Sequence, residues 1–514
     1  MNGAESLINA LADAGVDVCF ANPGTSEMQL VAAIDQQPKI RGILCLFEGV
    51  VTGAADGYGR MADKPALTLL HLGPGLGNGT ANLHNAKRAF SPVLNMVGDH
   101  ATYHLQYDAP LTADIEGFAE PVSGWIGVSQ SPNDLGSTGM AALSESMRYP
   151  GQIATFIAPA DHAWEPASPC QTPLSLPEVP KVSDEQLAAA VAALQGDGER
   201  MLFLGGRALR EDALWQAGRI AAATGARLVT ETFCARHQRG AGRVPVERLP
   251  YFGEQAAEAL QNTAQMVIVG SKPPVSFFAY PGKPSWLTPE GANLVALADP
   301  TIDALDTLTR LADALDAPAE PAQLQPRVQH TLETGPINQI ELGKIIANRL
   351  PTNAIVSDEG ATNSLGAFMM TGCAEPHDWM MLTGGAIGQG LPVAIGAAVA
   401  CPDRKVLALQ ADGSAMYTVQ SLWTMARENL DITVLLLNNN SYAILNIELQ
   451  RVGVENPGPT ALSLLDLSNP EIQWCDIARG MGVAAERVTT VEDLDAAFAR
   501  AMTTRGPHLI EVMV

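Results

Sequence analysis

Two polar turns in the last third of the chain carry residue types that suit magnesium and phosphate chemistry. Asp412 offers a carboxylate, and Asn439, one crossover unit further along, offers an amide oxygen. Mg²⁺ takes oxygen ligands in proteins and commonly shares its coordination shell with phosphate oxygens. The backbone N–H groups of Gly413 and Ser414, at the start of an expected helix, can hold a phosphate. Either turn alone would be an ordinary loop, but the pair predicts a site for magnesium and diphosphate.

The elements around these turns explain how they could meet. Each turn follows a short apolar run, 406–409 and 432–437, of the kind that forms a buried strand. A helical pattern from about Tyr417 to Glu428 lies between them. Strand, turn, helix, strand and turn is the order of a parallel crossover unit. Both turns then lie at the carboxyl edge of the sheet, where open α/β sheets bind ligands.

Two further candidates stand at strand ends in the first part of the chain. Glu48 follows an expected strand over 43–46 and precedes a helix of small residues, where a cofactor could approach closely. His71 ends an expected strand over 66–70 and precedes a Gly-rich stretch, which we expect to be a loop. A histidine there can donate a proton near neutral pH. The simpler alternatives are a helix-capping or solvated glutamate and a structural histidine.

Other polar turns could complete a site. Thr25 lies in the turn 22–27, where helix capping is the commoner role for such a residue. Thr362 lies after an expected strand over 355–357, and its hydroxyl could help to bind diphosphate. The Gly-dense stretch 384–392 is expected to form a loop that lets backbone approach a flat ring.

The composition limits the possible functions. The net charge of −24 argues against nucleic acid or an anionic membrane surface as a partner. No apolar run is long enough for a membrane span, and the N-terminus shows an amphipathic helix pattern instead of a signal peptide. The seven cysteines are scattered without a CxxC, so we expect neither disulfides nor zinc, and we expect a cytoplasmic location.

The chain is too long for one core and shows an internal similarity. Segments 53–75 and 394–413 both run from a small-residue helix through a charged link to an apolar strand and a turn. Strands alternate with helices throughout, which favours three consecutive parallel-sheet α/β domains. The expected organisation is a domain at 1–163, a linker at 164–182, a central domain at 183–316, a linker at 317–336 and a domain at 337–514.

The pattern of Asp-Gly, a crossover unit and Asn-Asn resembles the signature of thiamine diphosphate (ThDP) enzymes. The resemblance covers nearly the whole chain and is closest to acetolactate synthases and benzoylformate decarboxylase. The segment from Glu48 through Asp56, Gly57 and Tyr58 to Arg60 also looks like the helix that carries the activating glutamate of this family. Ala411 departs from the usual glycine, which would matter if that position needs a positive φ.

The resemblance implies a pyrimidine-binding first domain, a Rossmann-like central domain and a diphosphate-binding third domain. It implies that Glu48 bonds the pyrimidine N1′ of ThDP, that the Gly385 carbonyl accepts from the aminopyrimidine, and that Ile387 bends the cofactor. It also implies that Thr25 contacts the substrate. The implied Mg²⁺ ligands are Asp412, Asn439 and the backbone carbonyl of Ser441.

The implied reaction is decarboxylation of a 2-oxo acid to an enamine, which is protonated to an aldehyde or joined to a second carbonyl compound. His71 and Thr25 favour the decarboxylase outcome, whereas the C-terminal half looks equally like an acetolactate synthase. The decarboxylase uses a second histidine, and the comparable stretch 274–280 has none. FAD, which acetolactate synthases bind in the central domain, is possible but not favoured, because Gly205-Gly206 is only a weak signal.

In this family the cofactor lies between two chains, so the resemblance implies a homodimer or a homotetramer. The segment 451–463, rich in Gly, Pro and Asn, could close over the site. One rival is a non-catalytic protein that keeps the fold for regulation or assembly, but such a scaffold has no use for Glu48, Asp412 and Asn439 together. Another rival is a NAD-type dehydrogenase, but no dinucleotide fingerprint is present.

Overall fold

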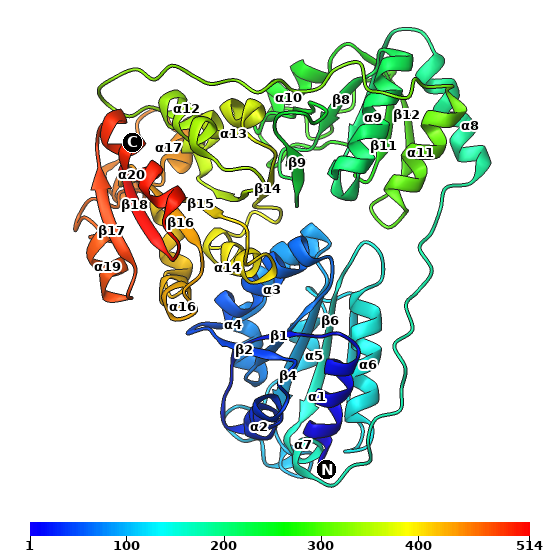
Figure 1. The fold of residues 1–514 in the computed structure, drawn as a ribbon, viewed down its shortest axis with the longest axis vertical. Helices are drawn as coiled ribbons and strands as arrows, with labels where there is room; N and C mark the ends of the chain where they lie inside the picture. The colour runs from blue at the N-terminus through cyan, green and yellow to red at the C-terminus, as the bar shows by residue number, and fades with distance from the viewer.

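Three sheets built almost entirely from parallel strands follow one another along the chain, and the computed structural model describes residues 1–514 (Figure 1). The expected α/β fold with three parallel sheets is therefore confirmed. The first sheet has the strand order β2-β1-β3-β4-β6-β5, with β2 (Arg41–Leu44), β1 (Val18–Asn22), β3 (Ala66–Leu70), β4 (Val93–Asp99), β6 (Ile153–Pro159) and β5 (Trp125–Val128).

The middle sheet has the order β10-β8-β7-β11-β12, and all its pairings are parallel. Its strands are β10 (Glu247–Arg248), β8 (Arg227–Thr230), β7 (Glu199–Leu204), β11 (Thr263–Val269) and β12 (Asn293–Ala298). The four longer strands lie where apolar runs predict them. The two-residue β10 carries no apolar run and leaves no such signal.

The third sheet has the order β17-β18-β16-β15-β13-β14-β9. Its strands are β17 (Ala484–Val488), β18 (His508–Met513), β16 (Ile432–Asn438), β15 (Val406–Ala411), β13 (Ile355–Glu359), β14 (His377–Met381) and β9 (His237–Arg239). The edge strand β9 comes from the middle part of the chain and pairs antiparallel to β14. The middle segment therefore completes a sheet that sequence reasoning assigned to the C-terminal segment alone.

The first and third sheets share one topology. When the strands of each sheet are numbered in chain order, without β9, both sheets read 2-1-3-4-6-5. Strand β3 then corresponds to β15, so His71 and Asp412 follow equivalent strands. This agreement supports the internal similarity seen in the sequence and indicates a duplicated α/β module.

The helices that precede these equivalent strands, α3 (Glu48–Ala62) and α14 (Gly390–Ala400), pack on each other at the centre of the molecule (Figure 1). Their backbones touch: a Cβ at Gly396 would lie 1.9 Å from the Ala54 carbonyl oxygen, and one at Gly57 would lie 2.1 Å from the Val393 carbonyl oxygen. The small residues of both helices are thus explained by this contact, which joins the first and third sheets.

Two local expectations are wrong. The Gly-rich stretch after His71 is not a loop but the first turns of α4 (Leu72–Ala89). Its glycines provide room for packing, since a Cβ at Gly79 would lie 2.8 Å from the Thr52 methyl group. The helix expected over Tyr417–Glu428 is shorter and broken, as α15 (Asp412–Ala415), a 3₁₀ turn η6 (Met416–Thr418) and α16 (Ser421–Arg427).

No helix combines the length and the apolar character that crossing a membrane requires. Further helices surround the three sheets (Figure 1). They are α1 (Gly3–Asp13), α2 (Met28–Gln36), α5 (Ile115–Ala119), α6 (Leu135–Ser146), α7 (Ala160–Trp164), α8 (Asp184–Gln195), α9 (Glu211–Thr224), α10 (Gly253–Leu260), α11 (Ala304–Ala314), α12 (Gln339–Arg349), α13 (Leu365–Met370), α19 (Trp474–Gly480) and α20 (Val491–Thr503).

Candidate active site

The two polar turns that follow β15 and β16 meet at the carboxyl edge of the third sheet. Strands β15 and β16 pair in parallel with Ala411 opposite Leu437, so Asp412 and Asn439 lie just beyond the same end. Asp412 is 2% exposed, and its Oδ1 accepts the Gly413 N–H at 2.9 Å. Its Oδ2 is buried and accepts no hydrogen bond. Burial raises the pKa of this carboxyl, because it disfavours the charged form. A cation bound at Oδ2 would offset that cost.

The neighbouring groups shape this edge. The Asn439 side-chain oxygen accepts the Ser441 N–H at 3.1 Å, which closes the second turn. The hydroxyl of Ser414 donates to the Ala411 carbonyl at 3.1 Å and accepts from Gln410 at 2.6 Å. Ala411 has φ −75° and ψ 147°, an extended conformation open to any residue, so its departure from glycine introduces no strain.

The Gly-dense loop between Gly384 and Gly390 is held by a buried carboxylate that sequence reasoning did not single out. Glu359, 4% exposed at the end of β13, accepts the N–H groups of Gly388 and Gly390, both at 2.7 Å. Burial raises the pKa of Glu359, whereas these N–H groups favour its charged form. The loop before α14 was expected, and Gly385 within it has φ 76°, the left-handed region.

Helix α4 holds the same loop from the side of the first sheet. Asn85 donates to the Ala386 carbonyl at 2.7 Å, and Asn82 donates to the Gly388 carbonyl at 3.3 Å. Ile387 lies between these two anchored residues and is half-buried. The loop is therefore fixed by polar side chains from both the first and the third sheets.

Glu48 is the first residue of α3 and is half-buried. Asn78 of α4 donates to its Oε2 at 3.0 Å, and no protein group donates to its Oε1. The neighbouring Phe47 is the N-cap residue of α3 and is also half-buried. One carboxylate oxygen is thus fixed in orientation while the other stays free to bind a ligand.

His71 pairs with a residue that the sequence reasoning missed. Its Nδ1 lies 2.8 Å from Oε2 of Glu27, which is 0% exposed, and the Gly24 N–H donates to the same oxygen at 2.7 Å. A Cβ at Gly24 would lie 2.2 Å from Nδ1, so only glycine allows the imidazole this position. Because a carboxylate only accepts hydrogen bonds, Nδ1 carries the proton in the neutral imidazole and Nε2 is left unprotonated. The signal in the sequence was the Glu that ends the turn Asn22–Glu27.

The two threonines lie at the ends of their strands as expected. Thr25 is exposed in the 3₁₀ turn η1 (Thr25–Glu27), whose N-cap N–H, that of Gly24, donates to the Glu27 side chain and not to Thr25. Thr362 is half-buried in η4 (Ala361–Asn363), which contacts α17 (Ala443–Arg451). Neither hydroxyl is used in capping or core packing that would exclude a role with a ligand.

An aromatic cluster from the middle segment lies over the Gly-dense loop. A Cβ at Gly385 would lie 2.9 Å from Cζ of Phe277. The Phe277 ring stacks edge-on with Phe233 and Phe278, at centroid distances of 5.5 and 5.0 Å. The stretch 274–280, which lacks histidine, thus brings an apolar ring to this loop.

Comparison with known proteins identifies the family. The description "Thiamine pyrophosphate enzyme, N-terminal TPP binding domain" matches residues 1–120, and the corresponding C-terminal TPP binding domain matches residues 358–512. IlvX of Mycobacterium tuberculosis, provisionally named an acetolactate synthase large subunit, is 50% identical over 515 residues, which cover 100% of this chain and 99% of IlvX. This chain belongs to the thiamine pyrophosphate enzyme family.

Two other relatives show the breadth of this family. Benzoylformate decarboxylase of Pseudomonas aeruginosa is 28% identical to this chain, over 97% of this chain and 96% of the decarboxylase. The fold also matches a solved ThDP-dependent 4-hydroxybenzoylformate decarboxylase of Rhodococcus jostii RHA1, with a TM-score of 0.88 and 23% identity over 100% of this chain and 99% of that one. The thiamine pyrophosphate (ThDP) fold is therefore shared with both decarboxylases and acetolactate synthases.

The residues present fit ThDP with Mg²⁺. The unpartnered Oδ2 of Asp412 and the amide of Asn439 are hard oxygen donors at one sheet edge, as Mg²⁺ requires. Glu48 offers a free carboxylate oxygen near the Asn-rich face of α4.

The helix that follows the Asn439 turn is tied to the middle segment. Helix α17 has no buried residue, and its last residue, Arg451, forms two hydrogen bonds to Glu254, at 2.6 and 2.9 Å. The Arg451 guanidinium also lies 4.4 Å from the Phe252 ring, and the Tyr280 hydroxyl donates to Glu448 at 2.5 Å. These contacts replace the missing core contacts of α17. The segment 451–463, which includes α18 (Pro459–Ser463), begins at this anchor.

Replacing Arg451 by Met should therefore release α17. Loss of the paired guanidinium should cost about 1 kcal/mol of local stability and raise the open population roughly fivefold. Limited proteolysis should show correspondingly faster cleavage between residues 443 and 463, because cleavage follows the open population. Arg479→Met, which removes the exposed pair with Asp476, is the matched control and should leave the rate unchanged. Equal cleavage in wild type and Arg451→Met would contradict an anchoring role.

Proposed function

We propose that this protein is a ThDP- and Mg²⁺-dependent enzyme that decarboxylates a 2-oxo acid. The observation that carries the proposal is the buried Oδ2 of Asp412, which lacks a partner at the sheet edge that also bears Asn439. A buried carboxylate oxygen without a partner is costly unless a ligand supplies one. The bound cofactor supplies a nucleophilic carbon for the keto group and an electron sink for the bond to CO₂.

The roles of the chain's own residues follow from their positions. Asp412, Asn439 and the Ser441 carbonyl hold Mg²⁺, and the N–H groups of Gly413 and Ser414, with the Thr362 hydroxyl, receive the diphosphate. At the other end Glu48 bonds the pyrimidine ring through its free oxygen, while Asn78 fixes the carboxylate. The Gly385 carbonyl would accept from the amino group of that ring, and Ile387, between two anchored residues, would pack against the cofactor.

His71 and Glu27 handle the substrate proton. With Nδ1 bound to Glu27, the other ring nitrogen has no protein partner and can exchange a proton with the substrate. The buried carboxylate fixes the orientation of the ring, so proton delivery needs no reorientation. Thr25, exposed at the same turn, is placed to contact the substrate. Delivery of a proton favours release of an aldehyde over joining to a second carbonyl compound.

The side chain of the acid is apolar or aromatic in this proposal. Phe277 and its neighbours bring apolar surface to the Gly385 loop, where the middle segment contributes no histidine. The decarboxylases named for benzoylformate and 4-hydroxybenzoylformate are consistent with such a substrate, whereas IlvX points to acetolactate formation.

We also propose that the protein forms a homodimer or a homotetramer with active sites between chains. We place it in the cytoplasm, with neither nucleic acid nor membrane as a partner. FAD is possible but not favoured as a further cofactor.

A screen of 2-oxo acids from pyruvate to benzoylformate tests this function. Purified protein with ThDP and Mg²⁺ is assayed for CO₂ release, and the products are identified. An aldehyde from a bulky or aromatic acid is the expected result. Acetolactate from pyruvate would instead place the protein with the synthases and leave His71 a structural residue. No CO₂ from any acid, with cofactor bound, would overturn the proposal.

Glu27→Gln tests the proton-handling pair. A Gln amide can donate to Nδ1 and so favour the opposite tautomer, with the proton on Nε2. The same Glu27 oxygen contacts Nδ1 and the Gly24 N–H, so an amide that donates to Nδ1 loses the Gly24 hydrogen bond, and an amide that accepts both loses the carboxylate charge beside the ring. In either orientation we expect turnover to fall about 10–100-fold while the protein stays folded. In a His71→Ala background the same change should cost little more, since the two residues act as one unit. Additive losses in the double variant would show that Glu27 acts independently of His71.

A further inference from the structure

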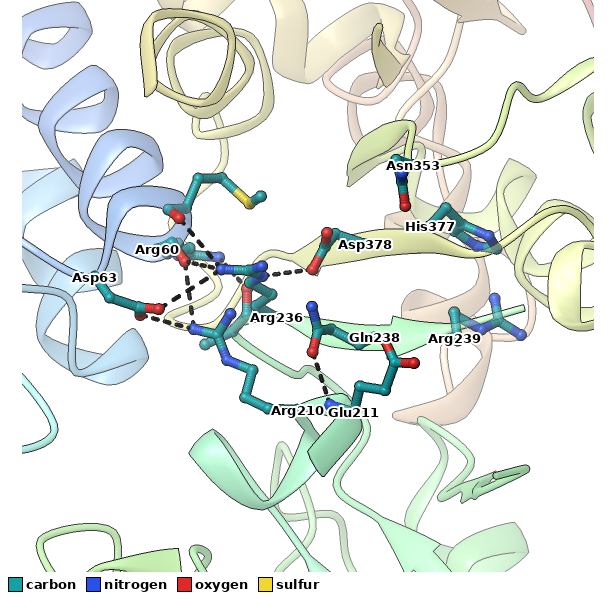
Figure 2. Close-up of polar contacts among 12 residues, drawn as sticks. Arg60, Asp63, Arg210, Glu211, Arg236, Gln238, Arg239, Asn353, His377 and Asp378 are labelled. Atoms are coloured by element: carbon teal, nitrogen blue, oxygen red, sulfur yellow. Dashed lines mark hydrogen bonds and ion pairs between the residues drawn. The ribbon is translucent and has the colours of Figure 1, made fainter. Parts of the chain in front are cut away.

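A cluster of arginines lies where the first segment, the middle segment and the third sheet meet (Figure 2). It includes a pair with Asp378 near the start of β14, whereas Asp412 lies beyond the carboxyl end of β15. Arg210, in the turn after η3 (Gly206–Leu209), donates to Asp63 at 3.1 Å. Arg207 of η3 lies 3.3 Å from the same carboxylate oxygen, and Arg236, just before β9, lies 3.9 Å from the other. Three guanidinium groups therefore share one carboxylate, which is 44% exposed.

The wider cluster also carries more positive than negative charge. Arg60 is paired with Asp56 at 2.6 Å, and Arg236 and Arg404 share Asp378, each at 2.5 Å. Five arginines thus form ion pairs with only three carboxylates, which are Asp56, Asp63 and Asp378. Burial, together with the nearby Arg236, lowers the pKa of Arg210 to about 10. In a chain with a net charge of −24, this local excess of cationic groups favours the binding of an anion.

The space at the cluster has two parts. An inner pocket of about 40 Å³ is lined by Arg60, Asp63, Arg207, Arg210 and Arg236. An outer cleft of about 590 Å³ shares four of these residues and adds Trp215 and Gln238. The inner pocket has room for one small anionic group, and the cleft lies within the usual range of small-molecule sites. Arg60 and Arg236 are only 3% and 8% exposed, so part of the cationic wall is fixed in the core.

Acidic groups also face the outer cleft, whose lining holds the three arginines Arg207, Arg210 and Arg236 and the three carboxylates of Asp63, Glu211 and Asp212, so the cationic excess belongs to the inner pocket. Glu211 is bound to Arg243 at 2.9 Å, and Asp212 accepts the N–H of Ala213 at 2.8 Å at the start of α9. The structural alternative is that the arginines only cap α3, since Arg210 and Arg236 donate to the Arg60 carbonyl at 3.3 and 2.9 Å. That role uses one or two of the donors on each guanidinium, and Arg207 takes no part in it.

The cluster is also distinct from the usual ligand crevice of the middle sheet. That crevice lies between β7 and β11, where the strand order reverses. Here the two loops fill it, since a Cβ at Gly205 would lie 2.7 Å from Cβ of Ser271. The arginines lie on the side of η3 that faces Asp63 at the end of α3.

We propose that this arginine cluster is a binding site for a small-molecule anion, whose phosphoryl or carboxylate head enters the inner pocket and whose body lies in the cleft beside Trp215. Guanidinium forks suit both head groups. The anion displaces Asp63 as the shared partner of Arg207 and Arg210 and ties the end of α3 to the middle segment. The site is separate from the proposed active site, so it holds whether or not the protein decarboxylates 2-oxo acids.

Inorganic phosphate and succinate are the probes for the two head groups. Thermal melting and calorimetric titration are performed on holoenzyme saturated with ThDP and Mg²⁺, so that the diphosphate site is filled, and sodium chloride of equal ionic strength is the reference. Phosphate, succinate or both should bind saturably in the titration and raise the melting temperature above the chloride value. Because phosphate also stabilises folded proteins by exclusion from their surface, the probe whose saturable binding Arg207→Gln weakens identifies the head group. Equal melting temperatures in all three salts would overturn the proposal.

Variants at the cluster give opposite expectations. Arg207→Gln should weaken binding of the effective probe roughly tenfold or more, because a charge-assisted hydrogen bond is lost. Asp63→Asn should tighten binding, since it removes the competing carboxylate, whereas a purely structural cluster would only be destabilised by it. Arg349→Gln, on a surface pair with Asp495, is the control and should bind as wild type. Unchanged binding in Arg207→Gln would contradict the assignment.

Discussion

Glu48→Gln should fold normally, bind ThDP and lose about 10²–10⁴-fold in turnover. The change keeps the shape of the side chain and its contact with Asn78, but it removes the carboxylate that bonds the pyrimidine ring. The loss corresponds to about 3–5 kcal/mol of transition-state stabilisation. Cofactor binding should persist because the groups proposed to hold magnesium and diphosphate lie on the third sheet.

Steady-state turnover of the acid found in the screen, together with a ThDP titration, measures both parts. Glu120→Gln, at an exposed position after α5, is the matched control and should keep wild-type turnover. Near-wild-type turnover of Glu48→Gln would exclude the mechanism. Loss of turnover together with loss of ThDP binding would instead show that Glu48 holds the cofactor in place.

Asp412→Asn should separate folding from cofactor binding. In the absence of Mg²⁺ the buried carboxylate lacks a partner for Oδ2, so a neutral amide should leave the stability of the apoprotein unchanged or higher. In the presence of cofactor the wild type gains stability by mass action, about 2.7 kcal/mol when ThDP is at 100 times its dissociation constant. The variant should lose that gain, because one charged Mg²⁺ ligand is gone.

Thermal melting with and without ThDP and Mg²⁺ measures this difference. Removing Mg²⁺ from wild type with a chelator should reproduce the behaviour of the variant. Asp403→Asn, at an exposed aspartate between α14 and β15, is the control and should keep the full cofactor-dependent shift. A full shift in Asp412→Asn would mean that Asp412 is not a metal ligand.

The sequence was most informative where a single strand or turn decides the outcome. Apolar runs predicted β3 and β8 with correct ends, and the turns after β15 and β16 placed Asp412 and Asn439 at one edge. The repeated order of helix, strand and turn anticipated the shared topology of the first and third sheets. These features depend on periodicity and on short polar turns, which are local properties of the chain.

The features that sequence reasoning missed depend on contacts between distant segments. Glu359 holds the Gly-dense loop only because β13 ends next to it, and Glu27 meets His71 because the adjacent strands β1 and β3 end at the same edge of the first sheet. Glycines in α4 indicate a loop by their propensity, but close packing against α3 overrides that preference. The short strand β9 carries no apolar run, and its pairing with β14 is set by tertiary structure.

The pairing of β9 with β14 protects the protein against aggregation. An uncovered β14 would present a row of free N–H and C=O groups, which are a template for aggregation. Residues 237–239 cover that edge, and Arg243 reinforces the junction by donating to the His377 carbonyl at 2.7 Å. The central segment thus keeps the edge of the C-terminal sheet from pairing with another chain. Because residues 237–239 are synthesised before residues 377–381, β9 has already left the ribosome when β14 emerges.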